Sequence, residues 1–242
     1  DIAASEQLAG EAAALTLPDD ARGDGVRAQI DLRLANQALS RSEYEVAEPL
    51  FRRGMATFER LNGHPDPEAA IPFSSLLHAT GRADEAEGVL RAALAQVERE
   101  TPPIHPGRAA LAAQLATNYT RRGLPEQAEP LLRKALEIKR AIYGDDHPSI
   151  DTTRHNLARC LTDLGRWADA EVIYRDVLRA QIGRYGESHP GVAASQAGLA
   201  RALLDSDRAA EAEPLWRSAQ ATAIAEFGER DAAVGITAIG LG

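Results

Sequence analysis

The sequence has little of what disulfide-rich or sheet-based folds need. One cysteine among 242 residues excludes an internal disulfide framework and any metal site built from several cysteines. Aromatic residues make up only 5% of the chain, whereas hydrophobic residues make up 44%, and 47 residues are alanine. A core of alanine and leucine suits closely packed helices better than a β-sandwich, whose strands favour β-branched and aromatic residues. The composition therefore predicts an all-α protein.

A cationic surface and a long apolar run are also missing. Lys and Arg number 27 against 36 Asp and Glu, for a net charge of −9. This balance argues against nucleic-acid binding, because neutralising phosphates requires a basic face. The longest stretches without Asp, Glu, Lys or Arg have 13 residues, 69–81 and 188–200, and the uncharged end of the chain, 232–242, has 11; all are too short to span a bilayer. We expect neither a nucleic-acid partner nor membrane insertion of this segment.

The chain does have an internal repeat of about 42 residues. Four kinds of marker share this period, and they are His-Pro (His64, His105, His147, His189), Ala-Glu (Ala47, Ala86, Ala128, Ala170, Ala212), glycine (Gly81, Gly123, Gly165) and aromatic-Gly (Tyr143, Tyr185, Phe227). The first His-Pro interval is 41 residues and the first Ala-Glu interval is 39, while the later intervals are all 42. Such periodicity predicts a stacked repeat architecture.

One period, residues 147–188, reads as two helices. Pro148 suits the first turn of a helix, where its missing N–H is not needed, and Gly165 suits the end of that helix. Apolar residues recur at helical spacing on both sides of this glycine. We expect Ala158 and Ala170 to lie where the two helices cross closely, with Leu157, Leu161 and Tyr174 around them. Such a pair cannot bury its apolar face alone and must stack on its neighbours.

These residues resemble a known family. Leu157-Ala158-x-x-Leu161 followed by Ala170-x-x-x-Tyr174 resembles the tetratricopeptide signature, in which a small and a large residue recur in each helix. The period, the Gly-Arg turns and the terminal Gly-x-x-His-Pro resemble the kinesin-light-chain subtype. The resemblance implies a right-handed superhelical solenoid of antiparallel helix pairs. The chain has 25 Arg but only two Lys, a preference that is typical of proteins encoded by high-GC bacterial DNA.

The repeat register also predicts domain boundaries. We expect five repeats, at about 26–63, 64–104, 105–146, 147–188 and 189–230. Residues 1–25 are expected to hold the second helix of a preceding repeat and a linker, and residues 231–242 the start of a further first helix. The full-length protein is therefore expected to continue in both directions. Pro72 falls inside the first helix of the second repeat and predicts a shortened or kinked helix there.

The sequence offers no catalytic or metal-binding constellation. Four of the six histidines mark the repeats, and neighbouring repeats lie about 10 Å apart, too far to share a zinc ion with bonds of about 2 Å. Cys160 and His155 are five residues apart on one helix, a poor spacing for a nucleophile and its base. Phosphate-binding, dinucleotide-binding and kinase motifs are absent. We expect no enzymatic activity, no cofactor and no metal.

Binding residues are expected on the first helix of each repeat. In arrays that this chain resembles, the first helices line a concave groove, and positions outside the packing columns face it. The candidates are Asn36, Ser75, His78, Thr117, Arg121, His155, Arg159, Thr162, Arg201 and Leu204. The arginines could hold an acidic segment by charge-assisted hydrogen bonds. Alternatively, Arg159 with Asp163 and Arg201 with Asp205 form i,i+4 pairs that only neutralise each other.

The resemblance implies a non-enzymatic scaffold that binds a peptide or a partner helix in its groove. Its partner is expected to be a protein or peptide, with an acidic segment where the arginines take part. Such arrays occur within larger signalling proteins, such as the C-terminal region of bacterial Ser/Thr kinases. Two alternatives stay open. One is a module that oligomerises its own chain through the ends of the array, and the other is a receptor for a small peptide signal.

Overall fold

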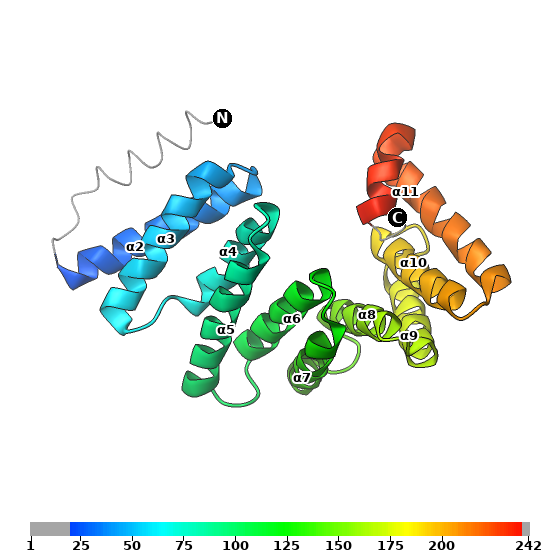
Figure 1. Ribbon diagram of the computed structural model, residues 1–242, viewed down its shortest axis with the longest axis horizontal. Helices are drawn as coiled ribbons and strands as arrows, with labels where there is room; N and C mark the ends of the chain where they lie inside the picture. The colour runs from blue at the N-terminus through cyan, green and yellow to red at the C-terminus, as the bar shows by residue number, and fades with distance from the viewer. Residues whose placement is uncertain (1–19, 239–242) are drawn as a thin grey trace. The chain divides into compact units, whose positions relative to one another are not determined.

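The computed structural model describes residues 20–238, and within this range all regular structure is helical. The helices in chain order are α2 (Ala21–Ser40), α3 (Tyr44–Asn62), α4 (Pro67–Ala79), α5 (Ala83–Glu100), α6 (Pro106–Arg121), α7 (Pro125–Tyr143), α8 (Pro148–Asp163), α9 (Trp167–Tyr185), α10 (Pro190–Asp205) and α11 (Ala209–Ala238). Each even-numbered helix packs along the odd-numbered helix that follows it (Figure 1). The predicted architecture of helix pairs is confirmed. None of these helices is long and apolar enough to cross a membrane.

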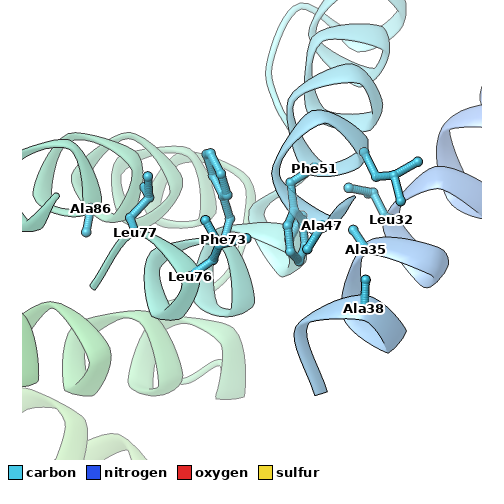
Figure 2. Packing of buried hydrophobic residues seen from close by; sticks show 11 residues of the cluster. Leu32, Ala35, Ala38, Ala47, Phe51, Phe73, Leu76, Leu77 and Ala86 are labelled. Carbon is cyan, nitrogen blue, oxygen red and sulfur yellow. The ribbon is translucent and has the colours of Figure 1, made fainter. Parts of the chain in front are cut away.

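The chain forms two compact units, residues 1–103 and 104–242. In the first unit the core joins α2, α3, α4 and α5 around small and aromatic side chains (Figure 2). Ala35 and Ala47 are fully buried at the crossing of α2 and α3. Phe51 and Phe73 lie with their ring centroids 5.5 Å apart, which links this helix pair to α4. Alanines therefore permit close crossing, and the larger side chains fill the space between neighbouring pairs.

The second unit repeats this packing in α8, α9 and α10. Ala158 and Ala170 are fully buried, and the Tyr174 side chain is only 1% exposed. The Tyr174 ring lies against Gly198 of α10, where a Cβ atom would come within 2.5 Å of the phenol. The predicted crossing residues of this repeat are confirmed, and a glycine in the next repeat provides the room for the large one.

Histidine side chains begin three of the first helices. The Nδ1 atoms of His105, His147 and His189 accept hydrogen bonds from the backbone N–H two residues later, at 3.0–3.2 Å. This satisfies a donor that a helix start would otherwise leave unpaired. His64 does not share this role, contrary to the His-Pro pattern. Asp66 caps α4 instead, by accepting from the backbone N–H of Glu68 at 3.0 Å.

The aromatic-Gly marker ends the second helices. Gly144 and Gly186 have φ of 76° and 82°, a conformation that favours glycine. This turn brings Tyr185 onto the ring of His189, with 4.5 Å between the ring centroids, and the equivalent rings before α8 are arranged in the same way. Gly228 has the same backbone conformation inside α11, so the helix is broken there.

Helix α4 is shorter than the helices that open the later repeats. It ends at Ala79, 42 residues before the end of α6, but has 13 residues where α6, α8 and α10 have 16. The missing residues are at its beginning, next to the cap at Asp66. The prediction of a shortened helix is confirmed. Helix α2 begins at Ala21, inside the stretch that the repeat register assigned to a linker, and residues 1–19 lie outside the described range.

Ion pairs explain why Glu recurs in the Ala-Glu marker and why Arg recurs in the turn of the next repeat. Glu129 of the Ala-Glu column lies 2.7 Å from Arg166 of the next Gly-Arg turn, and Glu171 lies 2.6 Å from Arg208. In the first unit, Glu48 and Arg82 form the same pair at 2.7 Å. Each pair joins the second helix of one repeat to the turn of the next. Hydrogen bonds from Arg133 and the charge of Arg166 lower the pKa of Glu129, so this carboxylate stays ionised at neutral pH.

Candidate functional site

An open groove of about 900 Å³ crosses the second unit where α6, α8 and α10 end. We call it the arginine groove. It is lined by Thr120, Arg121, Gly123, Pro125, Glu126, Arg159, Thr162, Asp163, Gly165, Trp167, Arg201 and Asp205. Four of the predicted site residues therefore meet here, namely Arg121, Arg159, Thr162 and Arg201. These residues belong to one helix face in successive repeats, so the 42-residue period brings them together.

Two of the three acidic residues of the groove contact one arginine, Arg201, and the third is Glu126. Asp163 lies 2.9 Å from Arg201, and Asp205 lies 3.8 Å from the same guanidinium. The expected Arg159–Asp163 pair does not form, because Arg201 of the neighbouring helix takes Asp163. The predicted Arg159–Asp163 pair is therefore wrong. The predicted Arg201–Asp205 pair does form, but it is longer than the contact of Arg201 with Asp163.

Arg121 and Arg159 have no ion pair among the described residues. The Nε atom of Arg159 is buried and has no hydrogen-bond partner there. Most other arginines of residues 20–238 do pair with a carboxylate, for example Arg166, Arg184 and Arg208. A buried donor without a partner costs free energy, about 1–3 kcal/mol, which an acceptor from a ligand would recover. The groove therefore holds two cations whose charge is not met from within the described chain.

His155 is not among the lining residues of the groove and is uncharged at neutral pH. Burial, with a smaller effect from the charge of Arg159, lowers the pKa of His155 to about 4. Its ring packs edge-on against Tyr174, and Nδ1 lies 3.3 Å from the Ser195 hydroxyl. Ser195 in turn donates to the side-chain oxygen of Gln181 at 2.9 Å. This histidine thus belongs to the packing between α8, α9 and α10 more than to the open groove.

The remaining candidates are spread over both units. Thr117 donates to the carbonyl of Ala113 at 2.9 Å, and Leu204 is 42% exposed outside the arginine groove. Asn36, Ser75 and His78 belong to the first unit. Asn36 donates to the carbonyl of Leu32 and lines a hollow of about 370 Å³ between α2 and α4. Ser75 is exposed and donates to the carbonyl of Ile71 at 3.2 Å.

The structure adds groove residues that were not predicted. Pro125, Glu126 and Trp167 open the second helices α7 and α9, whereas the prediction considered first helices only. The Trp167 side chain is 38% exposed. Its position beside the Gly-Arg turn, where the other repeats have Tyr, Ala or Pro, was the available signal.

Two features bear on chemistry. Burial, followed by the charge of Glu129, raises the pKa of the Cys160 thiol to about 11, and the thiol donates to the carbonyl of Pro125. A thiol in this environment stays protonated at neutral pH and is not an activated nucleophile. Within residues 20–238, no three His, Cys, Asp or Glu side chains are grouped so that they could hold a metal ion.

A family model matches more than half of the chain. A model described as tetratricopeptide repeat matches residues 73–141, 107–183 and 150–221. Comparison with curated sequences finds no significant match. Similar solved structures include BtubC (BKLC) from P. vanneervenii, with a TM-score of 0.75 and 20% identity over 94% of this chain and 91% of that one. A kinesin light chain of Podosopora anserina with nearly identical TPR-like repeats has a TM-score of 0.70 and 24% identity, over 84% and 98%. YrrB, a TPR protein with an unusual peptide-binding site, has a TM-score of 0.55 and 15% identity, over 86% and 90%.

Proposed function

The chain belongs to the tetratricopeptide repeat family, and we propose that it is a non-enzymatic scaffold whose arginine groove binds an acidic peptide segment of a partner protein. The observation that carries this proposal is the pair of arginines, Arg121 and Arg159, which form no ion pair with any described residue and line an open groove of about 900 Å³. A carboxylate is the ligand that two guanidinium groups prefer, because it accepts charge-assisted and bidentate hydrogen bonds.

The groove has the size and the contacts that an extended segment needs. Its volume lies within the range of ligand sites in proteins. Trp167 offers an apolar surface beside the arginines, and Thr162 is held by a hydrogen bond to the carbonyl of Ala158. Arg201 is engaged by Asp163, so it contributes less than the other two arginines. YrrB, whose fold is similar, is a TPR protein with a peptide-binding site, which agrees with this use of the fold.

The test is a binding titration with a labelled acidic probe. A seven-residue peptide rich in Glu is titrated with the full chain, and its Gln counterpart serves as the uncharged probe. We expect binding of the Glu peptide only, weakened at least tenfold by Arg159→Ala and by Arg121→Ala. Affinity should fall when salt is raised from low to physiological concentration, because ions screen the contact.

The matched control is Arg179→Ala on α9. Arg179 is exposed, and its one ion pair with a described residue is the solvated i,i+3 contact with Asp176, so its removal should leave the affinity unchanged. Equal weakening by Arg159→Ala and Arg179→Ala, or binding that is indifferent to salt, would contradict the acidic-peptide proposal. Light scattering of the same samples tests the alternative of self-assembly, which predicts a rise in mass with concentration that Arg159→Ala does not affect.

The signalling context is a further part of the proposal. Arrays resembling this one are joined to Ser/Thr kinases and other signalling proteins. A scaffold that binds acidic segments would recruit the target proteins of the kinase or signalling domain to which it is joined. The receptor alternative predicts that a short free peptide binds as tightly as the same segment within a folded protein. Titrating both forms against the full chain distinguishes the two.

A further inference from the structure

Two sets of equivalent positions in successive repeats carry most of the charge of the arginine groove. One set consists of the last residues of α6, α8 and α10, which are Arg121, Asp163 and Asp205. The other set lies four residues earlier on the same helices and consists of Thr117, Arg159 and Arg201. Side chains four residues apart on a helix can meet, so each arginine of the second set has an aspartate within reach on its own helix.

The closer ion pair nevertheless forms between two repeats. Arg201 of α10 lies 2.9 Å from Asp163 of α8, whereas its contact with Asp205 on its own helix is 3.8 Å long. The Asp163 side chain is 23% exposed and that of Asp205 is 41% exposed. The less exposed carboxylate is less screened by water and makes the stronger contact. Arg201 therefore pairs with the residue that ends the first helix of the preceding repeat.

The same arrangement cannot recur one repeat earlier. Helix α6 ends in Arg121 instead of an aspartate, so the equivalent partner for Arg159 is a second cation. Neither arginine forms an ion pair with a described residue, and the Nε atom of Arg159 is buried without a hydrogen-bond partner there. Arg121 thus interrupts the series of pairs, and two arginines are left in the lining of the groove.

Asp163 is a carboxylate for which two arginines compete. It follows Arg159 by four residues, so it could neutralise Arg159 from within α8. We propose that Arg201 is a positioning residue of the arginine groove, which holds Asp163 away from Arg159 and so keeps Arg159 available to the acidic segment. Arg201 acts through Asp163 and needs no contact with the ligand. The effect on binding rests on the proposed function, whereas the competition for Asp163 does not.

Titration of the full chain with the labelled Glu peptide tests the effect on binding. Arg201→Gln releases Asp163 and should weaken binding about two- to threefold, as expected from one ion pair within a helix. Arg201→Lys can still hold Asp163 and should bind like the wild type. When Asp163→Asn is added to Arg201→Gln, the wild-type affinity should return although Arg201 is still missing. Circular dichroism and melting temperatures check that all variants are folded.

The matched control is Asp205→Asn, also added to Arg201→Gln. Asp205 lines the same groove and carries the same charge, but it lies on α10 and not on the helix of Arg159. It should leave the affinity of Arg201→Gln unrestored. Equal restoration by the two asparagine variants would mean that Arg201 acts through the overall charge of the groove. No restoration by Asp163→Asn would mean that Arg201 contacts the ligand directly. Either result overturns the positioning role.

A measurement without peptide separates this proposal from the proposed function. NMR of the Arg159 guanidinium group in the ¹⁵N-labelled full chain reports its pairing, because hydrogen bonds to a carboxylate fix its orientation and slow its rotation. Rotation should slow in Arg201→Gln and return to the wild-type rate when Asp163→Asn is added. Arg121→Asp, which supplies the missing partner of Arg159, should also slow it and serves as the positive control.

The two measurements together have distinct outcomes. If Arg159 responds as expected but the Glu peptide does not bind the wild type, the proposed function fails and the competition for Asp163 stands. If the peptide binds and Arg159→Ala weakens it, but the Arg159 signals are the same in Arg201→Gln as in the wild type, the proposed function stands and the positioning role of Arg201 is overturned.

Discussion

The phenol of Tyr174 on α9 lies 2.5 Å from the position that a Cβ atom on Gly198 of α10 would occupy. Because Tyr174 is only 1% exposed, its ring has little room to move aside. This contact joins two repeats through one large side chain and one missing side chain. Packing therefore requires glycine at position 198, although glycine is a poor helix former.

We expect Gly198→Ala to lower the free energy of unfolding by about 1–3 kcal/mol, the usual cost of overpacking. Gly183 of α9 is the control, since no atom lies within 4 Å of a Cβ added there. Gly183→Ala should raise stability by about 0.5–1 kcal/mol, because alanine is the better helix former. Urea unfolding measures both. A stabilised Gly198→Ala variant would show that the ring moves freely.

Ala170→Leu and Ala168→Leu should differ in stability although they are two residues apart. Ala170 is fully buried at the crossing of α8 and α9, whereas Ala168 is exposed. We expect a loss of about 1–3 kcal/mol for Ala170→Leu and a change within about 0.5 kcal/mol for Ala168→Leu. Thermal unfolding compares them, and equal melting temperatures would refute the packing register.

The helix cap at His189 can be separated from its ring contact. His189→Ala and His189→Asn both remove the stack on Tyr185, but asparagine can still accept the hydrogen bond from Gly191. We expect His189→Ala to be less stable than His189→Asn by about 0.5–2 kcal/mol. Chemical unfolding of the two variants at neutral pH measures the difference. Equal stability would mean that the histidine acts through its ring and not as a cap.

His155 should make stability depend on pH between about 6.5 and 4. An unfolded histidine takes up a proton near pH 6.5, whereas the pKa of folded His155 is lowered to about 4. The unfolded state therefore binds more protons between these values, and stability falls as the pH is lowered from 6.5 towards 4. His155→Gln should remove this part of the dependence. Unfolding free energies at pH 7.5, 5.5 and 4.5 test it, and parallel profiles for the variant and the wild type would contradict it.

Much of the fold could be predicted from the sequence because the repeats bury the same positions. Ala158, Ala170 and Tyr174 were identified from spacing alone, since helical periodicity fixes which side chains share a face. The candidate site was less predictable. Arg121, Arg159, Thr162 and Arg201 share the groove, but Trp167 was missed because it begins a second helix.

The sequence by itself determined the helix pairs and signals such as the start of a helix at Pro148 and its end before Gly165, because these depend on residues within one or two turns. Only the tertiary structure decided which arginines are neutralised. Asp163 pairs with Arg201 of the neighbouring helix at 2.9 Å and leaves Arg159 without an ion pair among the described residues, although Arg159 is four residues away on the same helix. Contacts between repeats depend on how helices cross, which spacing along one chain does not specify.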